Sequence, residues 1–209
     1  MFNFDYSWYF LYIATLFLFD ISPGVSFVMT ATNTIKNRSL KSGFFTALGV
    51  ATSDYLSALI GFFFCTIINQ NQMAFKILQI IGVCILFYFA TKMLLSKTKE
   101  LSADNKTASK TLLSSYKSGF VITFTNIGVA TIIISVISQF YKYVNGFFGY
   151  FSLLISVPIV SFFSFFLVAV LVYFFKMWKV FGKYSWVIDK ISGIVLIMFG
   201  TLNLINILK

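Results

Sequence analysis

The sequence contains no histidine and only six acidic residues among 209, against sixteen lysines and arginines. Histidine is the commonest metal ligand and the side chain that most often changes charge near neutral pH. Its absence argues against a zinc enzyme and against most soluble enzyme chemistry. No glycine-rich phosphate-binding loop is present either. We therefore expect a protein without catalytic residues, without a metal site and without a bound cofactor.

Cysteine is scarce as well, because the chain has only Cys65 and Cys84. Both fall inside apolar runs, where free cysteine packs as a small hydrophobic residue, so we expect neither a disulfide bond nor a metal pair. The formal net charge is +10, but the basic residues lie between apolar segments instead of gathering on one solvated face. That distribution argues against a nucleic-acid partner. The first ten residues also lack the positive segment of a removable signal peptide.

What the sequence has in excess is apolar side chains. Hydrophobic residues make up 59% of the chain, aromatic residues 20% and charged residues 11%, and the mean hydropathy is +0.90. A soluble domain has about half apolar and a quarter charged residues, so this chain belongs in a lipid bilayer. Since a spanning helix needs about 20 mostly apolar residues, the sequence predicts one all-α membrane domain over residues 1–209 with six transmembrane helices. The predicted spans are Ser7 to Asn33, Ser42 to Ile68, Met73 to Leu95, Tyr116 to Phe140, Phe147 to Met177, and Val187 to Leu208.

Positive charge sets the predicted orientation, because cytoplasmic loops retain lysine and arginine. Thirteen of the sixteen basic residues follow the first predicted helix, surround the loop between the third and fourth, or lie between the fifth and sixth. Only Lys76, Lys142 and Lys209 fall on the other side. We therefore expect both chain termini on the outer side of the membrane.

A polar stretch at about residues 96–115 divides the six predicted helices into two sets of three. A unit with an odd number of spans, once duplicated, must lie upside down relative to its copy. Faint correspondences at an offset of about 104 residues support such a duplication: Pro23-Gly24 with Asn126 to Gly128, and Asp54 with Pro158. We expect two inverted three-helix repeats, over about residues 1–95 and 116–209, joined by a cytoplasmic loop.

Two carboxylates, Asp20 and Asp54, fall inside the apolar runs of the first and second predicted helices. Each costs at least about 2.5 to 3.5 kcal/mol at the centre of a membrane helix. Each lies 13 residues from the inner end of its helix, which is roughly 20 Å of helix, so the two could share one layer of a cavity. Intramembrane acids usually mark a substrate or proton pathway. The alternatives are a structural carboxylate, protonated or bonded to nearby hydroxyls, and for Asp20 a helix cap.

The segment Ser22-Pro23-Gly24 interrupts the first predicted helix. Proline removes a backbone donor and glycine adopts conformations that other residues avoid, so this helix should break near the middle of the bilayer. Broken backbone is tolerated there only where it is buried in protein or lines a watery cavity. The half-helix after Gly24 would direct its positive end at a substrate carboxylate, with the hydroxyls of Ser22 and Ser26 beside it. A kinked but ordinary helix is the alternative.

A second polar cluster lies in the fourth predicted helix, where Thr123, Thr125, Asn126 and Gly128 interrupt an aliphatic run. Threonine can bond to its own helix backbone, so this cluster is only a weak indication of a site. The candidate residues of a substrate or proton pathway are Asp54, Asp20, Ser22, Pro23, Gly24, Ser26 and Asn126.

Taken together, these segments resemble the LysE/RhtB family of amino-acid exporters. The resemblance lies in Ser22-Pro23-Gly24, the basic loop of Lys36, Arg38 and Lys41 that ends at Gly43, the run Ala47-Leu48-Gly49, and then Asp54 and Gly61. The segments FKILQIIGVCILFYFATKML, KSGFVITFTNIGVATIIISVISQF and DKISGIVLIMFGTLNL are similar to the family's third, fourth and last helices. Two positions depart from the family pattern. Val25 replaces a second proline and Asn126-Ile127-Gly128 replaces Asn-Pro-Lys, so we expect the second break to be softened.

The resemblance implies a six-helix carrier of the bacterial inner membrane that exports amino acids or related small solutes in exchange for protons. Its partners would be the small-molecule substrate and the lipid bilayer, and a homo-oligomer is left open. Asp54 would bind the substrate ammonium or the coupling proton, and Asp20 would assist. Two other classes stay open. One is a non-transporting membrane assembly protein, and the other is an intramembrane aspartyl protease, although neither aspartate lies in a Gly-x-Gly-Asp context.

Overall fold

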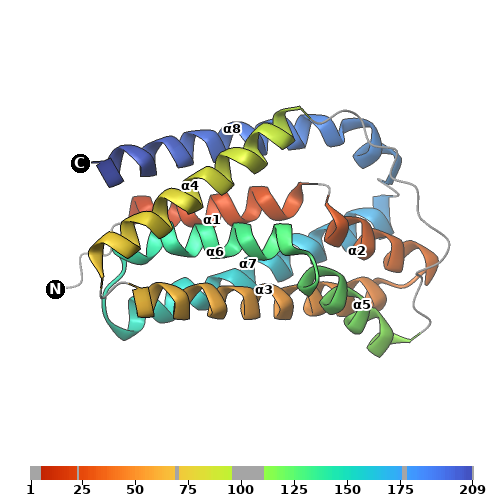
Figure 1. The fold of residues 1–209 in the computed structure, drawn as a ribbon. Helices are drawn as coiled ribbons and strands as arrows, with labels where there is room; N and C mark the ends of the chain where they lie inside the picture. Colours follow the sequence, from red (N-terminus) through yellow and green to blue (C-terminus); the bar gives the residue numbers. More distant parts are fainter. Residues whose placement is uncertain (1–5, 23, 69–70, 96–110, 176–177, 209) are drawn as a thin grey trace.

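The apolar runs of the sequence fold as helices, because in lipid every backbone N–H and C=O must find its partner within the protein. A computed structural model describes residues 6–22, 24–68, 71–95, 111–175 and 178–208, and the elements in these ranges are helical throughout (Figure 1). They are α1 (Tyr6–Ile21), α2 (Val25–Lys36), α3 (Leu40–Ile68), α4 (Gln72–Leu94), α5 (Leu112–Phe124), α6 (Ile127–Phe140), the short 3-10 helix η1 (Tyr141–Tyr143), α7 (Gly146–Phe175) and α8 (Trp178–Leu208).

Most of the predicted spans are present in the structure. Helices α3, α4 and α7 are long and apolar enough to cross a membrane, and the bent pairs α1–α2 and α5–α6 raise the number to five. Their ends lie within a few residues of the first five predicted spans. Helix α8 covers the sixth predicted span but begins at Trp178 instead of Val187, and its described apolar stretch, Gly193–Leu202, is shorter than a full span. The chain is an all-helical, multi-pass membrane protein. The predicted cytoplasmic loop lies mostly outside the described residues.

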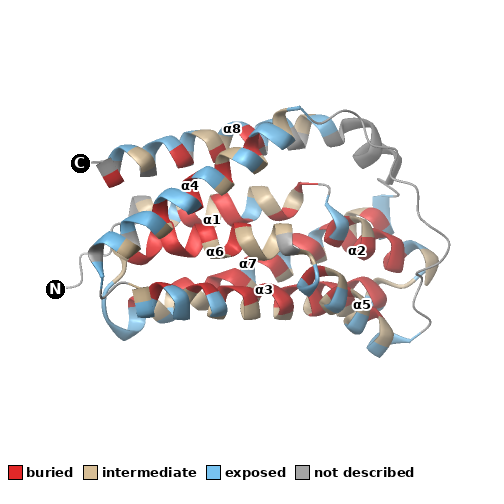
Figure 2. Ribbon diagram, viewed as in Figure 1, coloured by how far each residue is buried: buried red, intermediate tan, exposed pale blue. Residues whose placement is uncertain are grey.

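Apolar side chains cover much of the outer surface of the bundle. The most exposed large ones include Phe147 (76%), Ile67 (73%), Phe148 (72%) and Met73 (71%). Buried positions concentrate on α1, α2, α3, α6 and α7, whereas α4 and α8 carry many exposed ones (Figure 2). A soluble protein rarely exposes such extensive apolar surface, so this surface suits contact with lipid.

Each half of the chain contains a broken helix followed by two unbroken ones: α1–α2, α3 and α4 in the first half, then α5–α6, α7 and α8 in the second. The two broken helices run in opposite directions through the bundle, and the start of α1 lies at the same end as the end of α8 (Figure 1). This is the arrangement that an inverted duplication would produce. The duplication itself stays a prediction.

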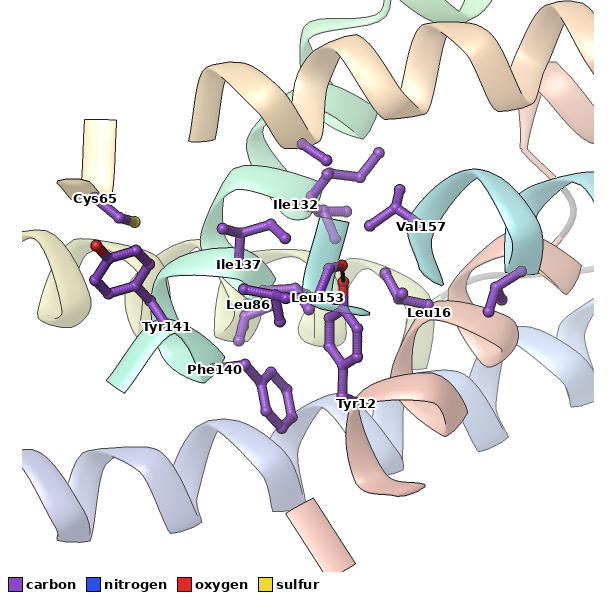
Figure 3. Packing of buried hydrophobic residues seen from close by; sticks show 14 of the residues in the cluster. Tyr12, Leu16, Cys65, Leu86, Ile132, Ile137, Phe140, Tyr141, Leu153 and Val157 are labelled. Atoms are coloured by element: carbon purple, nitrogen blue, oxygen red, sulfur yellow. Dashed lines mark hydrogen bonds between the residues drawn. The ribbon is translucent and has the colours of Figure 1, made fainter. Parts of the chain in front are cut away.

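Two clusters of buried apolar side chains hold the helices together. The larger one is built mainly by α1, α3, α4, α6 and α7 and includes Tyr12, Leu86 and Ile137 (Figure 3). The hydroxyl of Tyr12 donates a hydrogen bond of 2.6 Å to the carbonyl of Leu153, which satisfies its polar end. The smaller cluster is built by α2, α3 and α7 around Phe27. Helices α3 and α7 contribute to both clusters, each with one part of its length in the larger cluster and another part in the smaller one.

Glycines bring α3 and α5 into backbone contact. A Cβ added to Gly49 would overlap the carbonyl oxygen of Tyr116 and would lie only 2.8 Å from the nitrogen of Phe120. Gly119 of α5 faces the backbone of Thr46 in the same way. Such close approach maximises packing between helices in a membrane, where the hydrophobic effect does not drive helices together.

We expect Gly49→Ala to lower the free energy of unfolding by about 1–3 kcal/mol, because α3 and α5 must move apart to admit the methyl group. Reversible unfolding of the purified protein in detergent, followed by circular dichroism, measures this change. Gly24→Ala is the matched control, since Gly24 has an extended backbone and an added Cβ would meet nothing nearer than 3.8 Å. Equal stability of the two variants would contradict the close packing of α3 on α5.

Candidate functional site

The first helix breaks where the sequence predicts. Helix α1 ends at Ile21, α2 begins at Val25, and the two are bent by 58°. The helix is therefore broken and not merely kinked. Gly24 is the residue before the first turn of α2, and it has no side chain with which to cap that turn. The positive end of the α2 dipole lies at this break. Pro23 lies outside the residues that the structure describes.

The second break is sharp, and the expectation that it would be softened is wrong. Helix α5 ends at Phe124, α6 begins at Ile127, and the two are bent by 68°. The side-chain oxygen of Asn126 accepts a hydrogen bond of 3.1 Å from the N–H of Gly128 and so caps the start of α6. Asparagine is a strong helix N-cap, so the break forms without the proline that the family pattern has at this point.

Both breaks face a single cavity of about 280 Å³. The six candidate residues that the structure describes all line it: Asp20, Ser22, Gly24, Ser26, Asp54 and Asn126. Apolar side chains from several helices, among them Phe89, Met93 and Phe165, form much of the remaining wall. An apolar pocket with a few convergent polar groups is the usual form of a small-molecule site, and this volume lies at the small end of such sites.

The acids belong to a thin polar layer between the two apolar clusters. In three stretches of helix, a polar residue lies between a residue of the larger cluster and a residue of the smaller cluster. These sets are Leu16, Asp20 and Phe27 along α1 and α2; Ala58, Asp54 and Val50 along α3; and Val160, Ser161, Ser164 and Phe165 along α7. The polar layer therefore lies within the bundle, with tightly packed apolar side chains on both sides.

The carboxyl groups of Asp20 and Asp54 are brought together in this layer. Their exposed fractions are only 7% and 1%, and they lie close enough to interact electrostatically. The hydroxyl of Ser161 is within hydrogen-bonding reach of both, and that of Ser164 lies beside Asp20. Among the described residues, one oxygen of each carboxyl group and the Ser164 hydroxyl oxygen are buried without a hydrogen-bond partner. Gly24 occupies the capping position of α2 and has no side chain to cap it.

Two neighbouring buried carboxyl groups cannot both be ionised cheaply, because each charge is desolvated and repelled by the other. The pair therefore favours a proton or a cationic group of a ligand between the two carboxyl groups. Burial without complete hydrogen bonding is costly for a purely structural pair. The unpartnered oxygens thus point to a role in binding.

Hydrogen bonds fix the orientation of the half-helices around the cavity. The hydroxyls of Ser26 and Thr123 share a hydrogen bond of 2.8 Å that joins α2 to α5. Further along α2, the side-chain amide of Asn33 donates to the hydroxyls of Thr46 (3.0 Å) and Ser118 (2.8 Å). Helix α2 is therefore tied to both α3 and α5, and its start is held toward the cavity.

Sequence reasoning missed three polar residues of the site. Lys92 of α4 lines the cavity. From the sequence it is only one of the thirteen basic residues that indicate the cytoplasmic side. Ser161 and Ser164 lie one helical turn apart in the phenylalanine-rich α7, and this spacing was the available signal. No group of three or more His, Cys, Asp or Glu side chains placed to hold a metal ion occurs in the described part of the chain.

We expect Asp54→Asn to leave the free energy of unfolding unchanged or to raise it, because the amide keeps the shape and removes one of two neighbouring buried acids. Asn33→Ala is the comparison, since it removes two hydrogen bonds of a buried side chain and should cost about 1–3 kcal/mol. Thermal unfolding in detergent at neutral pH compares the two variants. An Asp54→Asn protein as unstable as Asn33→Ala would show that Asp54 serves the fold and not a ligand.

Comparison with known proteins identifies a family. The family model described as LysE type translocator matches residues 17–206. No curated protein and no solved structure matches the chain.

Proposed function

The chain belongs to the LysE type translocator family, as its motifs predicted, and on this premise we propose that it exports amino acids or related small solutes across a bacterial inner membrane. It is a membrane transporter, and its substrate is a small molecule. The observation that carries the proposal is the cavity on which two buried acids and the starts of α2 and α6 converge.

The cavity offers opposite charges to the two ends of an amino acid. The carboxyl groups of Asp20 and Asp54 attract a substrate ammonium group. The starts of α2 and α6 present backbone N–H groups and the positive ends of helix dipoles, which attract a substrate carboxylate. A zwitterion placed between them would neutralise both ends without bringing counter-ions into the membrane.

We propose that the acid pair exchanges the substrate ammonium for a proton. Because the two carboxyl groups are buried and close enough to interact, the pair favours binding about one positive charge. This charge is either a proton or the substrate ammonium group. Substrate binding from the cytoplasm would release the proton inward, and a proton arriving from outside would displace the substrate. An inward proton gradient would then drive solute export.

We also propose that both termini face the outside and that the two halves are inverted repeats. The excess of basic residues in the loops assigned to the cytoplasm supports the orientation. The opposite directions of α1–α2 and α5–α6 support the inverted relationship (Figure 1).

One competing function deserves an experiment, because an aspartyl protease also needs two neighbouring carboxyl groups. The pair in this protein is adjacent, but the cavity is small and the family transports solutes. The test must therefore measure both flux and peptide cleavage.

We expect vesicles containing the wild-type protein to release a preloaded amino acid when a proton gradient is imposed, and Asp54→Asn to abolish this release. The reason is that the variant keeps the cavity but loses one of the two acids that hold the exchanged cation. A panel of radiolabelled amino acids, loaded one at a time into proteoliposomes, provides the measurement.

Lys76→Met is the control for the vesicles, since Lys76 is an exposed residue near the other end of α4 and does not line the cavity. Its efflux should equal that of the wild type. Cleavage of a transmembrane peptide by the wild-type protein without any flux would favour the protease. Absence of both activities would favour an assembly protein.

A further inference from the structure

Lys92 is the one cationic side chain among the described residues that line the cavity. It lies in the last turn of α4 and is exposed. No ion pair links it to Asp20, Asp54 or any other described carboxylate, although it shares their cavity. A lysine that borders a polar cavity and has no anionic partner among the side chains that the structure describes is available to bind an anion.

The position of Lys92 follows from the packing of α4 against α6. The ring of Phe89 lies against Gly128, since a Cβ on that glycine would lie 3.2 Å from Phe89 Cζ. Lys92 is three residues beyond Phe89 and therefore on the same face of α4. Its ammonium group can thus reach the start of α6, where Asn126 and Gly128 also line the cavity.

The cavity consequently has two oppositely charged sides. The unpartnered oxygens of Asp20 and Asp54, both more than nine-tenths buried, provide the negative side. Lys92 and the first turn of α6 provide the positive side, and apolar side chains such as Phe89 and Phe165 also line the cavity. A ligand that matches this arrangement carries an ammonium group and a carboxylate group close together.

We propose that Lys92 binds the carboxylate of the transported solute and so restricts the site to amino acids, excluding the corresponding amines. This inference rests on the proposed function, whose substrate class it makes more specific. The lysine ammonium is a compact charge on a flexible stem, so it can follow a carboxylate from the rim of the cavity to the start of α6. Lys92 is thus a specificity-determining residue that contacts the substrate.

An ordinary interfacial lysine would behave differently. Such a residue extends its charge toward water and contributes only to topology. Lys76 of the same helix provides that comparison, because it is exposed and does not line the cavity. The experiment therefore compares Lys92→Met and Lys92→Arg with Lys76→Met.

The test measures binding and efflux of lysine and leucine beside their decarboxylated counterparts, cadaverine and isopentylamine. Binding to the purified protein is followed by isothermal titration calorimetry, and efflux by radiolabel in proteoliposomes. We expect Lys92→Met to weaken the binding of the amino acids by about tenfold or more, the effect of losing a hydrogen bond to a charged group. Binding of the amines should change less than about twofold, Lys92→Arg should restore much of the affinity for amino acids, and Lys76→Met should match the wild type.

The inference is overturned if Lys92→Met binds amino acids as tightly as the wild type, or if it weakens amines and amino acids equally. It is also overturned if Lys76→Met reproduces the effect, or if the wild type binds neither amino acid. The proposed function fails separately, when the wild type binds an amino acid with the expected dependence on Lys92 but does not release it from vesicles.

Discussion

The burial of two adjacent carboxyl groups within an apolar bundle is the constraint on which the rest of this protein depends. Asp20 and Asp54 lie close enough to interact electrostatically and are almost inaccessible, and each keeps one oxygen that has no hydrogen-bond partner in the described part of the chain. Isolated charges in such surroundings are strongly unfavourable. The protein meets this constraint with the hydroxyl of Ser161 and with a cavity that can admit a proton or a cationic group.

The two helix breaks provide the positive groups of the cavity, which are the dipole ends and N–H groups at the starts of α2 and α6. The two breaks form by different local chemistry. The first follows a proline–glycine pair in the sequence and places Gly24, which has no capping side chain, before the first turn of α2. The second has no proline: Thr125 follows the end of α5, and Asn126 caps the start of α6. Both helix starts therefore face the same cavity. The larger and smaller clusters pack on either side of this layer, and the hydrogen bond between Ser26 and Thr123 links the two halves of the chain.

Much of this architecture could be predicted from the sequence, because the bilayer imposes helix length and apolar composition. The first five helical segments, the break at Ser22 to Gly24 and the presence of two acids, Asp20 and Asp54, inside the bundle all follow from residue types. The sharp second break differs from the expectation, because Asn126 caps the start of α6 and the helix breaks there without a proline. Ser161, Ser164 and Lys92 were missed for another reason. Their roles depend on which face of α7 or α4 meets α1 and α6, and this is decided by tertiary packing.

The central claim is that the acid pair borders a cavity and holds a proton there. Carbodiimides react with protonated carboxyl groups, so treatment of the folded protein in detergent, followed by peptide mass spectrometry, tests this claim directly. The account predicts modification of Asp20 or Asp54 in the folded protein. A folded protein in which neither aspartate reacts, although both react after unfolding, would contradict it.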